Sequence, residues 1–414
     1  MKLLHTADLH LGKVFHDQSL IEDQAQMLED LTRLLENGAY TALLVSGDVY
    51  DRSIPSPEAV ELFGSFLGNL KQRCPDLHIL VIPGNHDSAS RLGYGRDIFS
   101  RFGINMAVSI ESCDKPVVIE KENESCAFFL LPFMPAGALL EEMACRMEKA
   151  RESFMESESG SSSNTRSRYS VLAAHLFTSG GEESGSERIF VGSAEQVNIS
   201  LFKGFDYIAL GHLHRCQEIS SAAAKASGFS AWYAGSPLAY SFAEAGQEKV
   251  FLSVELCAPT AAGSGNSVPK IEKIPIKPKH RVTSLSGPFS GFVGDISSNP
   301  EFLAAANDYL EIRLTDRSIT ENARDILRKC FPKLLSLRQD EALAQLSSAA
   351  RSRPLTGAGK HEAERRCITE DFRDFLTNLY GDENSSVWAA GEIKDEITLF
   401  EKLLAEVEEG EISS

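Results

Sequence analysis

Five short apolar segments of the chain each run directly into polar residues. The segments are KLLHTA, TALLVS, HILVIP, YSVLAA and FDYIAL, beginning at residues 2, 41, 78, 169 and 205. Runs of about four to eight apolar residues bounded by glycine or proline are typical of buried strands. Between the first three runs, apolar residues recur at helical spacing over about 18–37 and 56–72. This alternation predicts a layered α/β domain with a largely parallel sheet.

A second, smaller unit is predicted after this domain. Segments rich in Ser, Gly, Ala and Asn near 157–167 and 220–228 predict surface loops, and a third near 258–269 predicts the exit from the first domain. Further on, YLEIRL (309–314) and KLLSLR (333–338) indicate strands, with a helix between them. The predicted domains are 1–270 for the α/β domain, 271–345 for a small α+β capping domain, 346–365 for a linker and 366–414 for a helical tail.

The tail has apolar residues at helical spacing among many acidic ones. Two interpretations fit this pattern equally. The tail helices either pack back onto their own domain or dock onto a helix of a partner protein.

Charge and composition narrow the possible partners and locations. The formal net charge is −18 over 414 residues, which opposes non-specific binding to the phosphates of nucleic acid. A DNA substrate would therefore require bound metal ions, a local basic patch or a partner protein. We see neither an apolar signal-peptide region nor an apolar run long enough to span a membrane, so a cytoplasmic protein without membrane contact is expected. The eight cysteines are scattered without a C-x-x-C pair, which favours reduced thiols.

Seven potential metal ligands follow the ends of the predicted strands, where ligands of parallel sheets gather. They are Asp8, His10, Asp48, Asn85, His175, His212 and His214. Seven ligands suit two ions that share one carboxylate, and pairs of divalent ions about 3.5–4 Å apart catalyse displacement at phosphorus. Mixed nitrogen and oxygen donors without a thiolate favour Mn²⁺, with Fe, Co or Zn as alternatives. Spacing alone does not choose between Asp8 and Asp48 as the shared carboxylate.

The motifs DLHLG, GDVYDR, GNHD, AHLF and GHLH occur in this order. In this respect the chain resembles the calcineurin-like metallophosphoesterases. The stretches HTADLHLGK, PGNHDS, YIALGHLHRCQ and YAGSPLAYSF are similar to the branch formed by the nuclease subunits of bacterial SbcCD-type complexes. The resemblance in motifs covers residues 1 to about 255. It implies a two-sheet α/β sandwich as the metallophosphoesterase core.

The resemblance also implies a role for each ligand. Asp8, His10 and His214 would bind one ion, Asn85, His175 and His212 the other, and Asp48 would bridge both.

The resemblance also implies roles for three residues near the scissile phosphate. His86 would stabilise charge or protonate the leaving oxygen, Asp51 would orient His86, and Arg52 would bind phosphate. Asp87 is the alternative partner of His86, although a capping role for the following helix is favoured because Asp is a good N-cap residue.

The implied function is two-metal hydrolysis of DNA, as a 3′ to 5′ double-strand exonuclease and a hairpin and single-strand endonuclease. The implied partners are an SbcC-type coiled-coil ATPase, gripped by the tail, and a second copy of the nuclease bound through helices near 56–72 and 88–101, within a heterotetramer. Two alternatives remain: another phosphodiesterase or phosphatase of this fold, and a non-catalytic scaffold.

Overall fold

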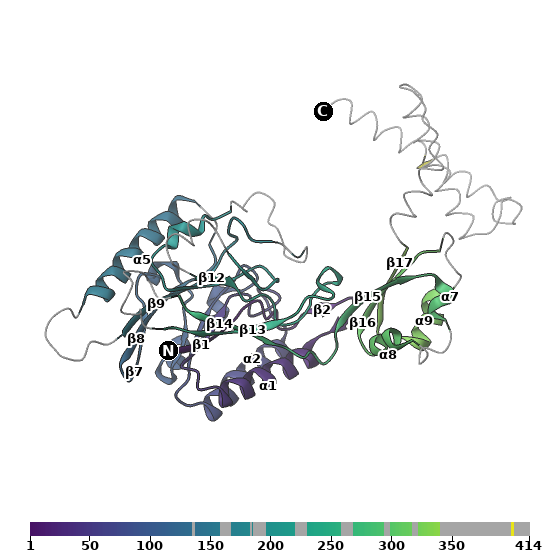
Figure 1. Ribbon diagram of the computed structural model, residues 1–414, viewed down its shortest axis with the longest axis horizontal. Helices are drawn as coiled ribbons and strands as arrows, with labels where there is room; N and C mark the ends of the chain where they lie inside the picture. Colours follow the sequence, from purple (N-terminus) through teal and green to yellow (C-terminus); the bar gives the residue numbers. More distant parts are fainter. Residues whose placement is uncertain are drawn as a thin grey trace, which may run out of the picture. The chain divides into compact units, whose positions relative to one another are not determined.

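The described part of the chain forms two six-stranded sheets, a three-stranded sheet and a two-stranded sheet (Figure 1). The computed structural model describes residues 1–134, 137–157, 167–182, 184, 196–219, 230–257, 268–293, 299–316, 322–339 and 399–400. The predicted linker (346–365) and nearly all of the predicted tail (366–414) lie outside these residues. Residues Met1–Asp340 form one compact unit.

The first sheet contains the three earliest predicted strands. In spatial order it consists of β14 (Lys270–Pro275), β13 (Val250–Glu255), β1 (Lys2–Thr6), β4 (Ala42–Ser46), β5 (His78–Ile82) and β6 (Ile104–Met106). From β1 to β6 neighbouring strands are parallel, whereas β13 and β14 are antiparallel additions. Strand β14 extends the first sheet to Pro275, past the predicted end of the first domain at residue 270.

The second sheet contains the two later predicted strands. Its order is β11 (Gln217–Glu218), β12 (Ser230–Tyr233), β10 (Tyr207–Gly211), β9 (Ser167–His175), β8 (Glu124–Leu131) and β7 (Val117–Lys121). Strands β12, β10, β9 and β8 are mutually parallel. The last residues of β1, β4, β5, β9 and β10 therefore lead into the polar motifs.

Helices cover the outer faces of the two sheets. They are α1 (Ile21–Asn37), α2 (Pro57–Arg73), α3 (Ala89–Leu92), α4 (Arg96–Phe99) and α5 (Ala138–Glu156). The two helices predicted between the first three strands correspond to α1 and α2. Shorter elements are β2 (Val14–Phe15), β3 (Gln18–Ser19), η1 (Ser100–Phe102), η2 (Ile110–Ser112), η3 (Ile199–Phe202) and η4 (Phe242–Glu244). Among the described residues, no helix combines the length and the apolar character that a bilayer crossing requires.

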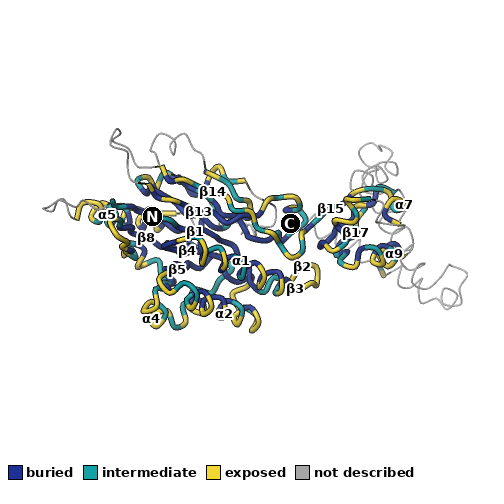
Figure 2. The backbone as a smooth tube through the Cα atoms, turned by 60° about the horizontal axis from the view of Figure 1, so that its bottom comes forward, coloured by how far each residue is buried: buried dark blue, intermediate teal, exposed yellow. Residues whose placement is uncertain are grey.

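The strands are apolar throughout because both of their faces are covered. Leu3 of β1 and Leu44 of β4 lie in the core between the sheets. Their neighbours Leu4 and Leu43 point the other way, into the core shared with α1 and α2. Figure 2 shows these strands as a buried band, with exposed residues along α2 and α4. The helix–sheet–sheet–helix layering confirms the predicted α/β class.

The smaller unit has its own core. Its parallel sheet contains β15 (Val282–Gly287), β16 (Tyr309–Leu314) and β17 (Leu334–Gln339), with α7 (Phe289–Phe292), α8 (Pro300–Ala305) and α9 (Ala323–Cys330). It contacts the first domain at α1, where buried Asp23 accepts hydrogen bonds from Tyr309 Oη at 2.8 Å and from the main-chain nitrogen of His280 at 3.1 Å.

Candidate metal centre

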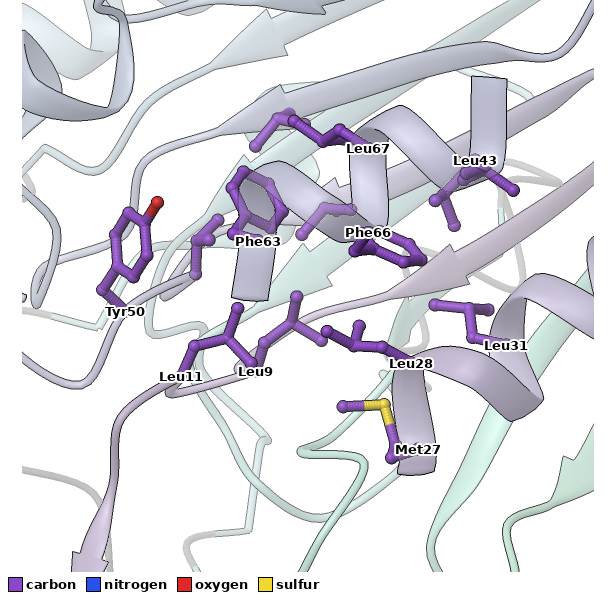
Figure 3. Close-up of a cluster of buried hydrophobic side chains, with 14 of the residues drawn as sticks. Leu9, Leu11, Met27, Leu28, Leu31, Leu43, Tyr50, Phe63, Phe66 and Leu67 are labelled. Atoms are coloured by element: carbon purple, nitrogen blue, oxygen red, sulfur yellow. The ribbon is translucent and has the colours of Figure 1, made fainter. Parts of the chain in front are cut away.

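The loops that follow the strands are joined by main-chain hydrogen bonds. Asp8 N donates to Gly47 O at 3.0 Å, and His10 N donates to Asp48 O at 3.0 Å. The residues between the potential ligands are apolar, and Leu9 and Leu11 lie in the core formed with α1 and α2 (Figure 3). The alternation in Asp-Leu-His-Leu thus anchors the loop on one side and presents ligands on the other.

Four potential ligands have left-handed backbone conformations. The φ angles are 53° for Asp8, 44° for His10, 48° for Asp48 and 111° for His212. Such conformations cost a non-glycine residue about 1–3 kcal/mol, and they persist only where the surrounding structure imposes them. They are therefore typical of functional sites.

The first group of ligands consists of Asp8, His10 and His214, which are all buried. One ligand atom of each lies within 4.8 Å of the others, and the Nε2 atoms of His10 and His214 are 3.1 Å apart. Two ring nitrogens and a carboxylate that converge out of water form a cation site. This group can bind a metal ion.

The second group surrounds Asn85. Its Oδ1 atom lies 2.9 Å from His175 Nε2 and 3.2 Å from His212 Nδ1. Asp48 stands between the two groups, because its Oδ2 atom is 3.5 Å from His175 Nε2 and 3.8 Å from His10 Nε2. The other oxygen, Oδ1, accepts a hydrogen bond from His86 N at 2.8 Å. Asp48 thus lies close to a histidine of each group, and Asp8 also clusters with Asp48 and His175.

Burial and charge distribute the protons of the metal-free centre unevenly. Burial raises the pKa of Asp8 to about 7. Burial opposes the charge of Asp48, but His175 and His10 lower the pKa of Asp48 well below its usual range. For His175 burial favours the neutral ring, whereas Asp48 raises the pKa of this ring to about 9. Burial lowers the pKa of His10 to about 4 and of His212 to about 3. Bound cations would displace the protons from Asp8 and His175.

His86 is oriented by a main-chain oxygen. Its Nδ1 atom lies 2.8 Å from the carbonyl oxygen of Asp51, which fixes the proton on Nδ1. The expected contact with the Asp51 carboxylate is not the one formed. That carboxylate accepts a hydrogen bond from Lys13 Nζ at 2.8 Å and lies 3.4 Å from His10 Nδ1. Burial opposes its charge, but His10 and Lys13 lower the pKa of Asp51 below its usual range. Arg52 is exposed, with Nε 3.7 Å from Asp51.

Asp87 neither orients His86 nor caps the next helix, so the favoured prediction is wrong. The N-cap of α3 is Ser88, which makes no side-chain cap hydrogen bond. The Asp87 carboxylate instead accepts from Val49 N at 3.0 Å, Tyr50 N at 2.9 Å and Gly84 N at 2.9 Å. It therefore ties the loop after β5 to the loop after β4, and thus Asn85 to Asp48.

Two glycines allow the loops to approach this closely. A Cβ atom on Gly84 would lie 2.2 Å from Asp48 Oδ1, and one on Gly211 would lie 1.8 Å from Ser46 O. A side chain at either position would displace the backbone that holds the ligands.

Sequence reasoning missed the polar residues behind the ligands. Gln24 is fully buried on α1; its Nε2 donates to His10 O at 2.7 Å, and its Oε1 accepts from Gly12 N at 2.9 Å. Its position in the apolar pattern of α1 was the available signal. Glu244, also fully buried, lies 3.3 Å from His214 Nδ1. Nothing in its local sequence separates it from a surface acid.

Beside Asn85 the surface is hollowed. A cavity of about 370 Å³ is lined by residues that include Asn85, Asp87, Ile110 and Phe133. The cavity therefore borders Asn85 of the second ligand group.

The chain is similar to known proteins in three comparisons. The sequence model described as calcineurin-like phosphoesterase matches residues 1–216. A curated relative from Staphylococcus epidermidis, the SbcD subunit of the nuclease SbcCD, is 30% identical over 345 residues, covering 81% of this chain and 85% of that protein. Among solved structures, a dimetal phosphatase from Danio rerio has a TM-score of 0.38 at 10% identity, over 66% of this chain and 98% of that chain. A protein of Thermus thermophilus has a TM-score of 0.35 at 11% identity, over 60% and 92%.

Proposed function

Because the chain belongs to the calcineurin-like phosphoesterase family, we propose that it is the nuclease subunit of an SbcCD-type complex. In this role it hydrolyses DNA phosphodiester bonds with two divalent metal ions. The observation that most supports the proposal is the position of Asp48 Oδ2, which lies within 4 Å of a ring nitrogen from each ligand group. A centre for a single ion would not need a carboxylate between two sets of ligands.

Each ligand group would bind one of the two ions. Asp8, His10 and His214 would hold one, Asn85, His175 and His212 the other, and Asp48 would contact both. The mixture of imidazole, amide and carboxylate donors makes Mn²⁺ the first choice. When bound, such ions lower the pKa of water toward about 7 and neutralise charge on the phosphoryl oxygens.

His86 is suited to proton transfer to the leaving oxygen. The Asp51 carbonyl accepts from Nδ1, so the neutral ring leaves Nε2 as its acceptor and the protonated ring can donate from Nε2. Asp51 contributes to this step through its main chain, while its carboxylate supports His10. Arg52, exposed on the same loop, would contact a substrate phosphate.

The relative from the SbcCD nuclease supports DNA as the substrate and an SbcC-type coiled-coil ATPase as the partner. The proposed reactions are 3′ to 5′ exonuclease action on duplex ends and endonuclease action on hairpins and single strands. They would serve repair, recombination and replication in the cytoplasm. Residues 366–414 would grip the ATPase, which would supply the DNA affinity that a net charge of −18 opposes.

Exposed apolar side chains support a nuclease homodimer. Ile54 and Val60 are 68% and 48% exposed around the start of α2, and Tyr94, Ile98 and Phe102 are 85%, 64% and 63% exposed around α4. Apolar side chains left in water favour burial against a second surface. A second copy of this chain would provide it, with each nuclease bound to one ATPase in a heterotetramer.

A cleavage assay with matched variants tests this function. The full chain with its coiled-coil ATPase should cleave hairpin and duplex-end DNA in Mn²⁺. His86→Asn and Asp48→Ala should each reduce cleavage by at least about 100-fold, whereas His78→Asn, at the other end of β5, should not. Rapid hydrolysis of a phosphopeptide without DNA cleavage would identify a phosphatase instead. No hydrolysis of either substrate would identify a scaffold.

A further inference from the structure

A buried ion pair lies directly behind one of the ligand histidines. The side chains of Glu244 and Lys249 are 0% and 8% exposed, and Lys249 Nζ donates to Glu244 Oε2. Glu244 Oε1 lies 3.3 Å from His214 Nδ1. Lys249 Nζ also donates to the main-chain oxygen of His214 at 3.1 Å. The pair therefore holds His214 at both its ring and its backbone.

Hydrogen bonds satisfy the remaining polar atoms of this pair. Glu244 accepts from Ser236 Oγ at 3.2 Å and from Tyr240 N at 3.3 Å, and Lys249 Nζ donates to Ser236 Oγ at 2.9 Å. A buried ion pair is costly unless such additional hydrogen bonds complete it. Hydrophobic residues at both positions together would avoid that cost, so the charged pair indicates a role beyond stability.

The other ligand histidines have different support. His175 Nδ1 lies 2.9 Å from the carbonyl oxygen of Ser46. His10 Nδ1 is 3.4 Å from the Asp51 carboxylate, which is shared with Lys13. A carboxylate on the second nitrogen of a ligating histidine fixes its tautomer and strengthens it as a donor, whereas a carbonyl has a weaker effect. In the ligand group of Asp8, His10 and His214, the Glu244 carboxylate thus contacts His214 Nδ1 within hydrogen-bond distance, whereas His175 Nδ1 has only a carbonyl oxygen there.

We propose that Glu244, held in place by Lys249, is a positioning residue that raises the affinity of the ion bound by Asp8, His10 and His214. This ligand group is then the tighter of the two ion sites. The inference rests on the two-ion centre proposed above and adds to it an order of binding. Glu244 is a positioning residue because it acts through His214.

The test is a Mn²⁺ titration of the full chain by calorimetry, with electron paramagnetic resonance to count bound ions. Wild type should bind two ions with different affinities. Glu244→Gln should weaken the tighter site by about 10–100-fold and leave the weaker site unchanged. Glu248→Gln is the matched control, because Glu248 is exposed and close in the sequence and its substitution removes the same charge. It should bind both ions as wild type does.

A second variant separates positioning from folding. Glu244→Gln leaves Lys249 buried without its carboxylate, so Glu244→Gln with Lys249→Met removes both charges together. The double variant should fold and show the same selective loss. If the double variant bound Mn²⁺ with unchanged affinities, or if both of its ion sites were weakened equally, the inference would be overturned. Wild type that binds fewer than two ions would refute both the inference and the proposed two-ion centre, whereas two ions unaffected by the variants would refute only the inference.

Discussion

Asp23 fixes the smaller unit to the first domain, and its removal should loosen that contact. The residue lies on α1 with 3% of its surface exposed. Its carboxylate accepts hydrogen bonds from the main-chain nitrogen of His280 at 3.1 Å, from the ring nitrogen Nδ1 of His280 at 2.9 Å and from Tyr309 Oη at 2.8 Å. Asp23→Ala leaves these three donors without their acceptor.

The size of the effect depends on how much water replaces the carboxylate. A buried donor without a partner costs about 1–3 kcal/mol. A cavity of about 390 Å³ is lined by Asp23, His280 and Tyr309, so water can reach the donors and the lower figure applies. Three donors at about 1 kcal/mol each give about 3 kcal/mol, which corresponds to about a 100-fold change in an opening equilibrium.

Amide hydrogen exchange measures this equilibrium directly. In Asp23→Ala, the amides of β15 and β16 should exchange about 100-fold faster, whereas those of β4 and β5 should not change. Glu22→Ala is the control, because Glu22 is exposed and forms a surface ion pair with Lys279, an interaction that contributes little. Equal exchange rates in the two variants would refute the assignment of the contact to the buried carboxylate.

Two further predictions concern the metal centre. Gly84→Ala should abolish Mn²⁺ binding measured by calorimetry, because its Cβ would lie 2.2 Å from Asp48 Oδ1, and the fold measured by circular dichroism should remain; near-normal binding would contradict the close approach. Without bound metal, the protein should lose thermal stability as the pH rises from 6.5 to 9. The pKa of His175 is about 9 in the folded protein and near 6.5 in the unfolded chain. The stability that its proton provides is therefore complete below pH 6.5 and is lost as the pH rises through 9. Melting in EDTA measures this slope, and a flat or rising profile would contradict it.

The strands and the positions of the ligands were predictable because a buried strand with covered faces has an apolar signature. The strand-end rule then brought Asp8, His175 and the other ligands to one edge. The missed strand, β14, has the sequence KIEKIP, in which charged residues alternate with apolar ones at the edge of a sheet. Such a segment has no continuous apolar run to distinguish it from a linker.

Contacts through the main chain could not be predicted from residue types. His86 is oriented by the main-chain carbonyl oxygen of Asp51, and every residue has such an oxygen. The acidic side chain at this position led to the expectation of a carboxylate contact instead. Asp87 binds main-chain nitrogens of Val49 and Tyr50, which lie far away in the sequence. Sequence spacing places loops at an edge, but the hydrogen bonds between loops depend on the folded backbone.

Where a candidate ligand has a left-handed backbone conformation, selection for stability and selection for metal binding favour different residues. Asp8, Asp48 and His10 have φ values that glycine adopts without cost. Asp8 and Asp48 also accept hydrogen bonds from main-chain nitrogens, whereas His10→Gly would relax the backbone and delete only a candidate ligand, so a laboratory evolution experiment that rewards heat resistance in the presence of a chelator should enrich His10→Gly. A histidine kept at position 10 in a natural population would therefore indicate that the proposed metal centre is still in use.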